Sequence, residues 1–262
     1  MGVSNAPTMP PMDIFLVAVA SLLAGFVDAI VGGGGLILLP ALFAVYPTAV
    51  PATLLGVNKG SSVWGTAAAT WSYTRRVQLR WGPLAAGAVL ALAGSFAGAW
   101  LVTRVSPDFL RRILPVVLLA VFLYTLWRKD LGQYHKPRLH GVAEIGAVGV
   151  LGLVVGFYDG FFGPGTGSFF VFLLVRWLGY DFLHASASAK LLNTASNLAA
   201  LSLFAWTGHV WWHVVAVTAV ANVLGSLLGT RLALKHGAGF VRVFFMLVVG
   251  ALLLKTGWSA YA

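Results

Sequence analysis

The stretch GFVDAIVGGGG at residues 25–35 returns half a chain length later as GFYDGFFGPGTG at residues 156–167. Each copy places an aspartate, Asp28 or Asp159, four residues before a glycine-rich break, and the separation of these two aspartates is called the repeat offset below. Further pairs at the repeat offset, without gaps, are Lys59 and Lys190, Trp81 and Trp212, Gly94-Ser95 and Gly225-Ser226, and Asp13 and Glu144. Chance does not produce matches at one constant offset among rare charged residues and glycines. We therefore interpret the chain as a duplicated and fused unit.

The composition excludes an ordinary soluble protein. Hydrophobic residues make up 59% of the 262 residues and charged residues only 9%, whereas soluble domains carry about 25% charged residues. A chain so poor in charge cannot cover a globule with water-compatible side chains, which excludes a soluble enzyme, a disordered chain and a nucleic-acid-binding protein. The sequence predicts a polytopic membrane protein in contact with the lipid bilayer.

The apolar segments have the same order in each half. They lie at 13–31, 36–46, 54–73, 83–103 and 109–127, and at 143–161, 168–178, 185–206, 212–234 and 238–257. A helix needs ~20 residues to cross a bilayer, so the second segment of each half is too short to cross upright. We expect an all-α fold in which each half is a broken helix hairpin, long then short, followed by three transmembrane helices. The predicted parts are a tail at 1–12, repeat 1 at 13–131, a basic linker at 132–142 and repeat 2 at 143–262.

The basic residues predict that the second copy is inverted in the membrane. The loop at 74–81 holds three arginines, whereas its counterpart at 205–212 holds no Lys or Arg, so the two equivalent loops lie on opposite sides. The inner side then collects eleven basic residues, which are Arg75, Arg76, Arg80, Arg128, Lys129, Lys136, Arg138, Arg176, Arg231, Lys235 and Arg242. The outer side collects four, which are Arg104, Arg111, Arg112 and Lys255.

Each glycine-rich break predicts an interrupted helix deep in the membrane. Glycine adopts φ > 0 and lets other backbone approach, and non-helical backbone at this depth is tolerated only inside the protein or beside water. The short helix after each break, from Leu36 or Ser168, is expected to present free N–H groups and a positive dipole end to an anion. Asp28 and Asp159 are candidates to cap the broken helices by accepting N–H bonds and to carry coupling protons or gate the substrate, and these two roles are compatible.

A lysine is expected to open the next long helix of each half, at the head of a polar stripe. Positions three and seven residues after the lysine share its helix face. These positions hold Ser62 and Thr66 after Lys59, and Asn193 and Asn197 after Lys190. Each lysine either snorkels to an interface or pairs with the aspartate of its own half, or the two lysines recognise an anion together.

The predicted site therefore collects polar and glycine residues from both halves. The substrate-binding candidates are Asn58, Lys59, Ser62, Thr66, Lys190, Asn193, Asn197, Gly33, Gly34, Gly35, Gly165, Thr166, Gly167 and Ser168. The coupling or gating candidates are Asp28 and Asp159. No catalytic constellation, P-loop or metal-ligand motif is visible, so we expect no enzyme activity, no cofactor and no metal.

The two motifs and the paired lysines also carry a family resemblance. Four stretches resemble the TauE/SafE family of sulfite exporters and sulfonate permeases, and most closely its YfcA-type branch. They are GFVDAIVGGGGLILLP at 25–40, Asn58-Lys59, GFYDGFFGPGTGS at 156–168 and AKLLN at 189–193. One departure is Val57, where the family often has Thr. The resemblance implies a multi-pass protein of the bacterial cytoplasmic (inner) membrane that carries sulfur oxyanions or organosulfonates.

Repeats, polar groups at matching depths and the resemblance together predict a secondary transporter. We expect it to move a small anion, such as sulfite or a sulfonate, by alternating access between the inverted repeats, with coupling to protons as one hypothesis. An anion channel and a transporter of another organic anion are the alternatives. The sequence carries no signal for the number of subunits.

The charge distribution makes a prediction about topology. Because equivalent loops differ by three arginines to none, both termini should lie outside the cytoplasm. A reporter that is active only in the cytoplasm should be silent when fused after Ala262 and active when inserted after Val77. Activity of the fusion after Ala262 would contradict the inverted arrangement.

Overall fold

The computed structural model describes residues 10–106, 109 and 136–261. Within these residues the chain forms eight helices and no strand, which agrees with the predicted all-α fold. The helices are α1 Pro11–Val31, α2 Gly35–Val45, α3 Pro51–Thr74, α4 Trp81–Val102, α6 Gly141–Phe161, α7 Thr166–Arg176, α8 Phe182–Trp206 and α9 Trp212–Tyr261. The predicted segment 109–127 lies outside the described residues except for Phe109.

The first seven of these helices match the predicted segments to within three residues at each end, and each half contains the expected long and short pair. The expectation that the lysines open their helices is wrong. Pro51 starts α3 and Asp181 caps α8 by accepting the N–H of His184 at 2.8 Å, so Lys59 and Lys190 both lie eight residues inside a helix. Both lysines therefore lie in the interior of their helices, about two turns after the first residue.

The predicted segments 212–234 and 238–257 both lie within α9, which is interrupted between them. Gly237 has φ 72° and ψ −166°, which are not helical angles, and it lies within the gap between the two predicted segments. Because glycine tolerates positive φ, the chain changes direction here without a connecting loop.

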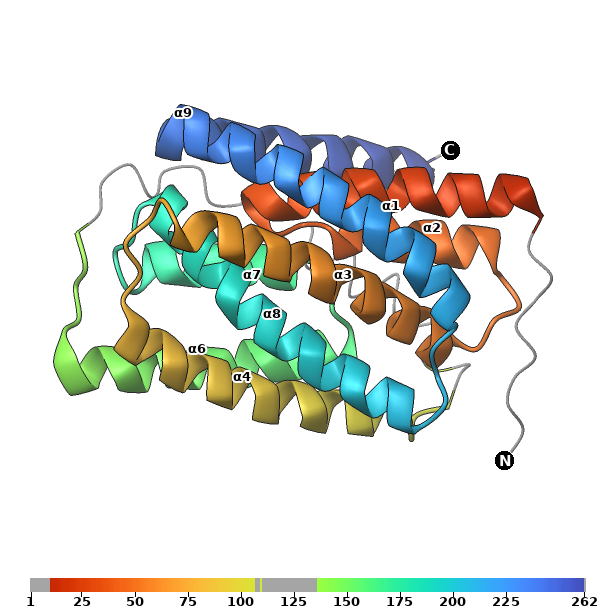
Figure 1. Ribbon diagram of the computed structural model, residues 1–262, viewed down its shortest axis with the longest axis horizontal. Helices are drawn as coiled ribbons and strands as arrows, with labels where there is room; N and C mark the ends of the chain where they lie inside the picture. Colours follow the sequence, from red (N-terminus) through yellow and green to blue (C-terminus); the bar gives the residue numbers. More distant parts are fainter. Residues whose placement is uncertain (1–9, 107–108, 110–135, 262) are drawn as a thin grey trace.

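The helices pack in three rows. Figure 1 shows α3 and α8 crossing through the middle, with α1 beside α9 along one edge and α4 beside α6 along the opposite edge. Eleven of the 23 buried polar side chains that the structure describes lie on the two central helices, including both buried lysines, whereas α1, α4, α6 and the first part of α9 are long and apolar enough to cross a membrane. The fold thus surrounds a polar centre with apolar helices.

The two outer rows are α1 with α9 and α4 with α6. Glycine contacts in one outer row have equivalents in the other, in which both residues are displaced by the repeat offset. Gly25 of α1 packs against the backbone of Asn222 in α9, and Gly156 of α6 packs against the backbone of Ala91 in α4. Gly225 and Gly94, each four residues before another glycine, meet the carbonyls of Leu22 and Leu153 in the same way. The glycine pairs thus let the helices of each outer row pack with their backbones in close contact.

Hydrogen bonds to the central helices follow the same offset. The Ser95 hydroxyl donates to the carbonyl of Ser196 at 2.6 Å, and the Ser226 hydroxyl donates to the carbonyl of Gly65 at 2.6 Å. Each serine lies in an outer row, and each acceptor lies in a central helix. The two halves therefore exchange equivalent contacts with one another.

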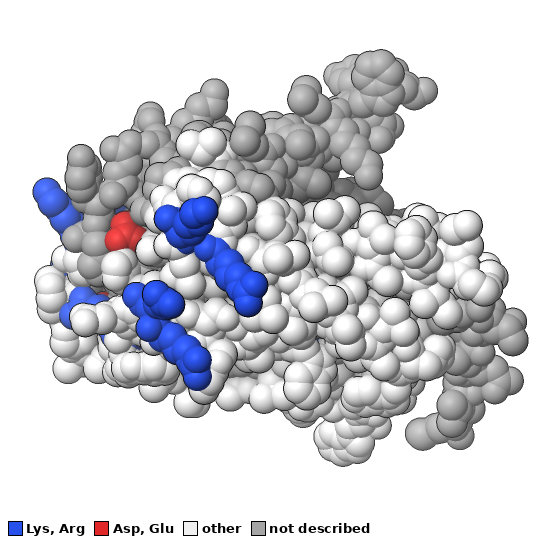
Figure 2. Space-filling model, turned by 45° about the horizontal axis from the view of Figure 1, so that its top comes forward, with Lys and Arg blue, Asp and Glu red and all other residues white. Residues whose placement is uncertain are grey.

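The charged surface lies toward one end of the molecule. In Figure 1 the α3–α4 loop, the start of α6 and the α7–α8 loop lie together at the end opposite the start of α1. The basic residues in these segments or directly before them are Arg75, Arg76, Arg80, Lys136, Arg138 and Arg176. Figure 2 shows Lys and Arg gathered toward one end of the face in view, beside a wide area without charged side chains. This distribution matches the group of basic residues that the sequence assigned to one side.

Two glycines on the same helix give a matched test of the packing. A Cβ at Gly156 would stand 2.6 Å from the carbonyl oxygen of Ala91, whereas a Cβ at Gly146 would meet nothing within 4 Å. Gly156→Ala should therefore destabilise the protein by about 1–3 kcal/mol through overpacking. Gly146→Ala should be neutral or stabilising by up to about 1 kcal/mol, because alanine favours the helix. Thermal unfolding of the purified variants measures both, and equal Tm values would contradict the tight α4–α6 contact.

Candidate functional site

The two helix breaks meet each other at the centre of the fold. Gly32 ends α1 with φ 83°, and its carbonyl accepts the N–H of Ser168 at the start of α7, at 3.0 Å. The Ser168 hydroxyl donates to the carbonyl of Val31 at 3.0 Å, and Gly167 packs directly on the backbone of Gly32. The break after α1 is thus hydrogen-bonded to the break after α6.

Two buried ion pairs cross between the halves at this point. Lys59 of α3 lies 2.6 Å from Asp159 of α6, and Lys190 of α8 lies 2.9 Å from Asp28 of α1. The side chains of both lysines are at most 1% exposed. Each lysine therefore pairs with the aspartate of the other half, and the hypothesis that it pairs with the aspartate of its own half is wrong. Snorkelling is also wrong, because a lysine that snorkels leaves its charge in water.

Asp28 is fully engaged. Its Oδ1 accepts the N–H of Gly34 at 3.2 Å, and its Oδ2 accepts a hydrogen bond from Lys190 at 2.9 Å. The Lys190 ammonium also donates to the backbone carbonyl of Asp28. The capping hypothesis is thus confirmed for Asp28, which binds the glycine turn with one oxygen and the opposite half with the other.

Asp159 has a different environment. Its Oδ1 pairs with Lys59, whose ammonium also donates to Asn197 Oδ1 at 3.2 Å. Among the described residues, Asp159 Oδ2 has no hydrogen-bond partner, and neither has Asn197 Nδ2 or Asn58 Oδ1, although all three atoms are buried. Buried polar groups are normally hydrogen-bonded, so these three atoms leave hydrogen-bonding capacity near Lys59 that a ligand or a water can use.

A small polar cavity lies between these groups. Its lining consists of Asp28, Gly32, Gly35, Asn58, Lys59, Ser62, Asp159, Gly163, Gly167, Asn193 and Asn197. The cavity leaves only about 10 Å³ for the centre of a water molecule, which is the room that a single water needs. A sulfonate group, with one sulfur and three oxygens, is larger than this, so the described conformation is closed around the site.

Nine of the sixteen predicted site residues line this cavity. Seven do not, namely Gly33, Gly34, Gly165, Thr166, Ser168, Thr66 and Lys190. Thr66 is buried but turns its hydroxyl back to the carbonyl of Ser62 at 2.8 Å, as threonine inside a helix often does. Thr166 bonds the carbonyl of Gly163 at 2.7 Å, and Lys190 lies behind Asp28.

The expected free N–H groups of the short helices are not free at the named positions. The N–H of Leu36 donates to the carbonyl of Gly33 at 3.0 Å, and the N–H of Ser168 donates to Gly32. The prediction of free N–H groups at Leu36 and Ser168 is therefore wrong, because Leu36 is bonded within its own break and Ser168 is bonded to the break of the other half. Gly32 and Gly163, absent from the predicted site, line the cavity, and their place in the repeated motif was the available signal.

A second buried polar cluster lies near the charged end. Glu144, in the first turn of α6, pairs with Arg80 at 2.9 Å and accepts a hydrogen bond from the Tyr180 hydroxyl at 2.7 Å. Burial, and then the hydrogen bond to Glu144, raise the pKa of Tyr180. The cluster joins the starts of α4 and α6 to the α7–α8 loop and was not predicted.

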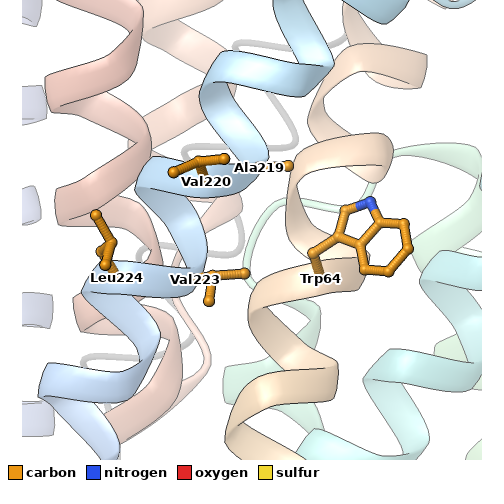
Figure 3. Close-up of a pocket in the computed structure, with 5 residues that line it drawn as sticks. All are labelled: Trp64, Ala219, Val220, Val223 and Leu224. Carbon is orange, nitrogen blue, oxygen red and sulfur yellow. The ribbon is translucent and has the colours of Figure 1, made fainter.

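A larger hollow on the surface is apolar. It lies between α3 and α9, has a volume of about 360 Å³ and is lined by Trp64, Ala219, Val220, Val223 and Leu224 (Figure 3). Trp64 is 58% exposed at its edge. Four of its five side chains are hydrocarbon and Trp64 adds a single N–H, so the hollow suits lipid tails better than a charged ligand, and the polar cavity remains the candidate site.

Broken helices that meet at a buried polar cavity, inside apolar helices of membrane-spanning length, define a membrane transporter. Comparison with known proteins agrees. Residues 17–256 match the family described as sulfite exporter TauE/SafE, and the chain belongs to this family.

Similar relatives are named as probable membrane transporters. The chain is 36% identical over 252 residues to the probable membrane transporter protein YfcA of Escherichia coli (strain K12), covering 96% of this chain and 92% of the relative. It is 37% identical over 238 residues to a probable membrane transporter protein of Sinorhizobium sp, covering 90% and 89%. A probable membrane transporter protein of Haemophilus influenzae is 35% identical over 248 residues, covering 90% and 92%. No solved structure matches the chain.

The ion pairs predict a specific pattern of stabilities. Lys190→Met leaves the buried Asp28 carboxylate without its cation and should destabilise the protein by about 3–5 kcal/mol. Adding Asp28→Asn removes the stranded charge, so the double variant should be more stable than Lys190→Met alone. Lys235→Met, which removes an exposed lysine, is the control and should change little. Additive effects in thermal unfolding would show that the pair does not couple the halves.

Proposed function

We propose that the protein is a secondary transporter of small anions, in particular sulfite, sulfonates or related sulfur oxyanions. The observation that carries the proposal is the closed polar cavity at the junction of the two helix breaks, with Lys59 in its wall. A buried ammonium group beside amide donors suits an oxyanion, because charge-assisted hydrogen bonds replace the water that the anion gives up. The family description supports sulfur chemistry.

We further propose that the halves are inverted repeats in the cytoplasmic membrane of a bacterium, as repeats 1 and 2 at 13–131 and 143–262, joined by the basic linker at 132–142. The support is the set of contacts that recur at the repeat offset, together with the basic residues toward one end. Two halves that exchange equivalent contacts can rock against each other and expose a central site to either side in turn.

The size of the cavity favours a carrier over an open channel. A cavity with room for one water provides no continuous aqueous path in the described conformation. An anion would enter only when the helices around Lys59 separate. Coupling to protons through the aspartates is part of the proposal, because the cavity already balances its charges and an added anion leaves one negative charge in excess.

A ligand screen tests the proposed function. Purified protein should be stabilised against heat by one or more of sulfite, thiosulfate, sulfoacetate and taurine, since a ligand that binds only the folded state raises its Tm. Carboxylates of similar size test the alternative of another organic anion.

Lys59→Met then tests the site. Losing the charge-assisted bond from the ammonium should cost roughly 1.5–3 kcal/mol, or about a 10- to 150-fold loss of affinity for the compound that binds. Arg75→Ala is the matched control, because Arg75 is an exposed cation stacked 4.3 Å over Trp71 and outside the cavity lining. If no compound binds, or if Lys59→Met binds as tightly as the parent, the proposed function at this site is rejected.

A further inference from the structure

The repeat is broken at the polar positions around the two ion pairs. Asn58, beside Lys59, corresponds to Ala189 beside Lys190, and Asn197, which bonds Lys59, corresponds to Thr66. Thr66 directs its hydroxyl to its own helix. Two amide side chains therefore accompany Lys59, and neither has an equivalent beside Lys190.

The hydrogen bonds follow this difference in sequence. Both carboxylate oxygens of Asp28 accept bonds from donors, Gly34 N–H and the Lys190 ammonium. Asp159 uses only Oδ1, toward Lys59, and its Oδ2 is buried without a partner among the described residues. The cavity lining includes Lys59 and excludes Lys190. The carboxylate of the Lys190–Asp28 pair thus has a hydrogen bond on each oxygen. The carboxylate of the Lys59–Asp159 pair keeps one oxygen able to accept a further bond, next to the central polar cavity.

We propose that the two pairs have different tasks. Lys190–Asp28 is a fixed clamp between the halves, and Lys59–Asp159 is the working pair. A bound sulfonate takes the place of Asp159 at Lys59, and Asp159 accepts one proton as it is released. This inference rests on the proposed function and assigns the proton to one of the two aspartates.

Charge balance requires the proton. The charged groups that face Asp159 are Lys59 of α3 and Asp28 of α1, and Asp28 is matched by Lys190 of α8. The other described groups of the lining are neutral amides, one hydroxyl and glycines, and the neighbouring Tyr158 hydroxyl donates to the carbonyl of Pro164 at 2.6 Å. Two lysines and two aspartates sum to zero, so a monovalent anion leaves one negative charge unpaired in a medium that solvates charge poorly.

Protonation restores neutrality without a further reactant. The proton comes from water on the side to which the cavity opens and binds the Asp159 carboxylate, while Lys59 remains an ammonium and pairs with the sulfonate. On the opposite side the anion leaves, Asp159 returns its proton to water and the original pair forms again. One proton therefore accompanies each monovalent anion in the same direction.

Asparagine substitutions distinguish the roles of the two aspartates, and this test needs no ligand. In Asp28→Asn the amide NH2 must face either the Gly34 N–H or the Lys190 ammonium, so two donors confront each other. In Asp159→Asn the amide oxygen can face Lys59, and the NH2 takes the position of Oδ2, which accepts no bond. Asp28→Asn should unfold about 3–10 °C below Asp159→Asn in the same detergent. Equal Tm values would overturn the assignment of a clamp and a working pair.

The proton is tested by the pH dependence of binding to the full-length purified protein. Methanesulfonate is the probe, because it stays fully ionised throughout the pH range of the titration and contributes no proton of its own. The affinity of the parent should rise about tenfold for each unit by which the pH falls, as linkage to one proton requires. Asp159→Asn should lose this dependence and bind at all pH values about as tightly as the parent does at low pH.

A further variant completes the test. Glu144→Gln, which removes a buried carboxylate outside the cavity and leaves the four central charges in place, should keep the tenfold dependence. The inference is overturned if Asp159→Asn keeps the dependence, if Glu144→Gln loses it, or if binding follows sodium concentration instead of pH. If neither methanesulfonate nor any compound of the screen binds, the proposed function fails. The comparison of Tm values between Asp28→Asn and Asp159→Asn still tests whether Lys190–Asp28 is the clamp.

Discussion

Four charges buried together at the centre of an apolar fold constrain everything around them. Lys59, Asp159, Lys190 and Asp28 are each at most 8% exposed, and a buried charge that loses its partner costs several kcal/mol. Because each pair joins one half of the chain to the other, the two halves cannot move apart at the centre of the fold without separating opposite charges. The helix breaks, the glycine contacts and the central position of α3 and α8 are the arrangement that brings these four groups together.

The sequence was sufficient for the helices because the signals that define them are local. Apolar runs, proline starts and glycine breaks lie within one element, and the repeat offset identified matching depths in the two halves. The exchange of partners between the halves was not predicted. Whether Lys59 meets Asp28 or Asp159 depends on how α3 crosses α1 and α6, and spacing along the chain does not encode that crossing.

Two further differences have simple physical reasons. The N–H groups expected to face an anion at Leu36 and Ser168 are taken by Gly33 and Gly32, because non-helical backbone in the membrane interior must satisfy its own hydrogen bonds. Thr66 lies on the predicted face of α3, but its short side chain bonds its own helix more readily than it reaches the cavity. Asn197, at the corresponding position of α8, is long enough to reach Lys59, so the same helical face gives different chemistry in the two halves.

The tightness of the polar cavity also limits how strongly any substrate is bound. In the proposed anion carrier, only the fraction of molecules whose helices have separated around Lys59 accepts an anion, and the apparent dissociation constant equals the intrinsic one divided by that fraction. Each contact that is made only in the closed arrangement lowers this fraction. A substitution on the outer rows that loosens the closed state can therefore increase apparent affinity without touching the substrate, and turnover in such a carrier depends on keeping the closed and separated populations within a few kcal/mol of each other.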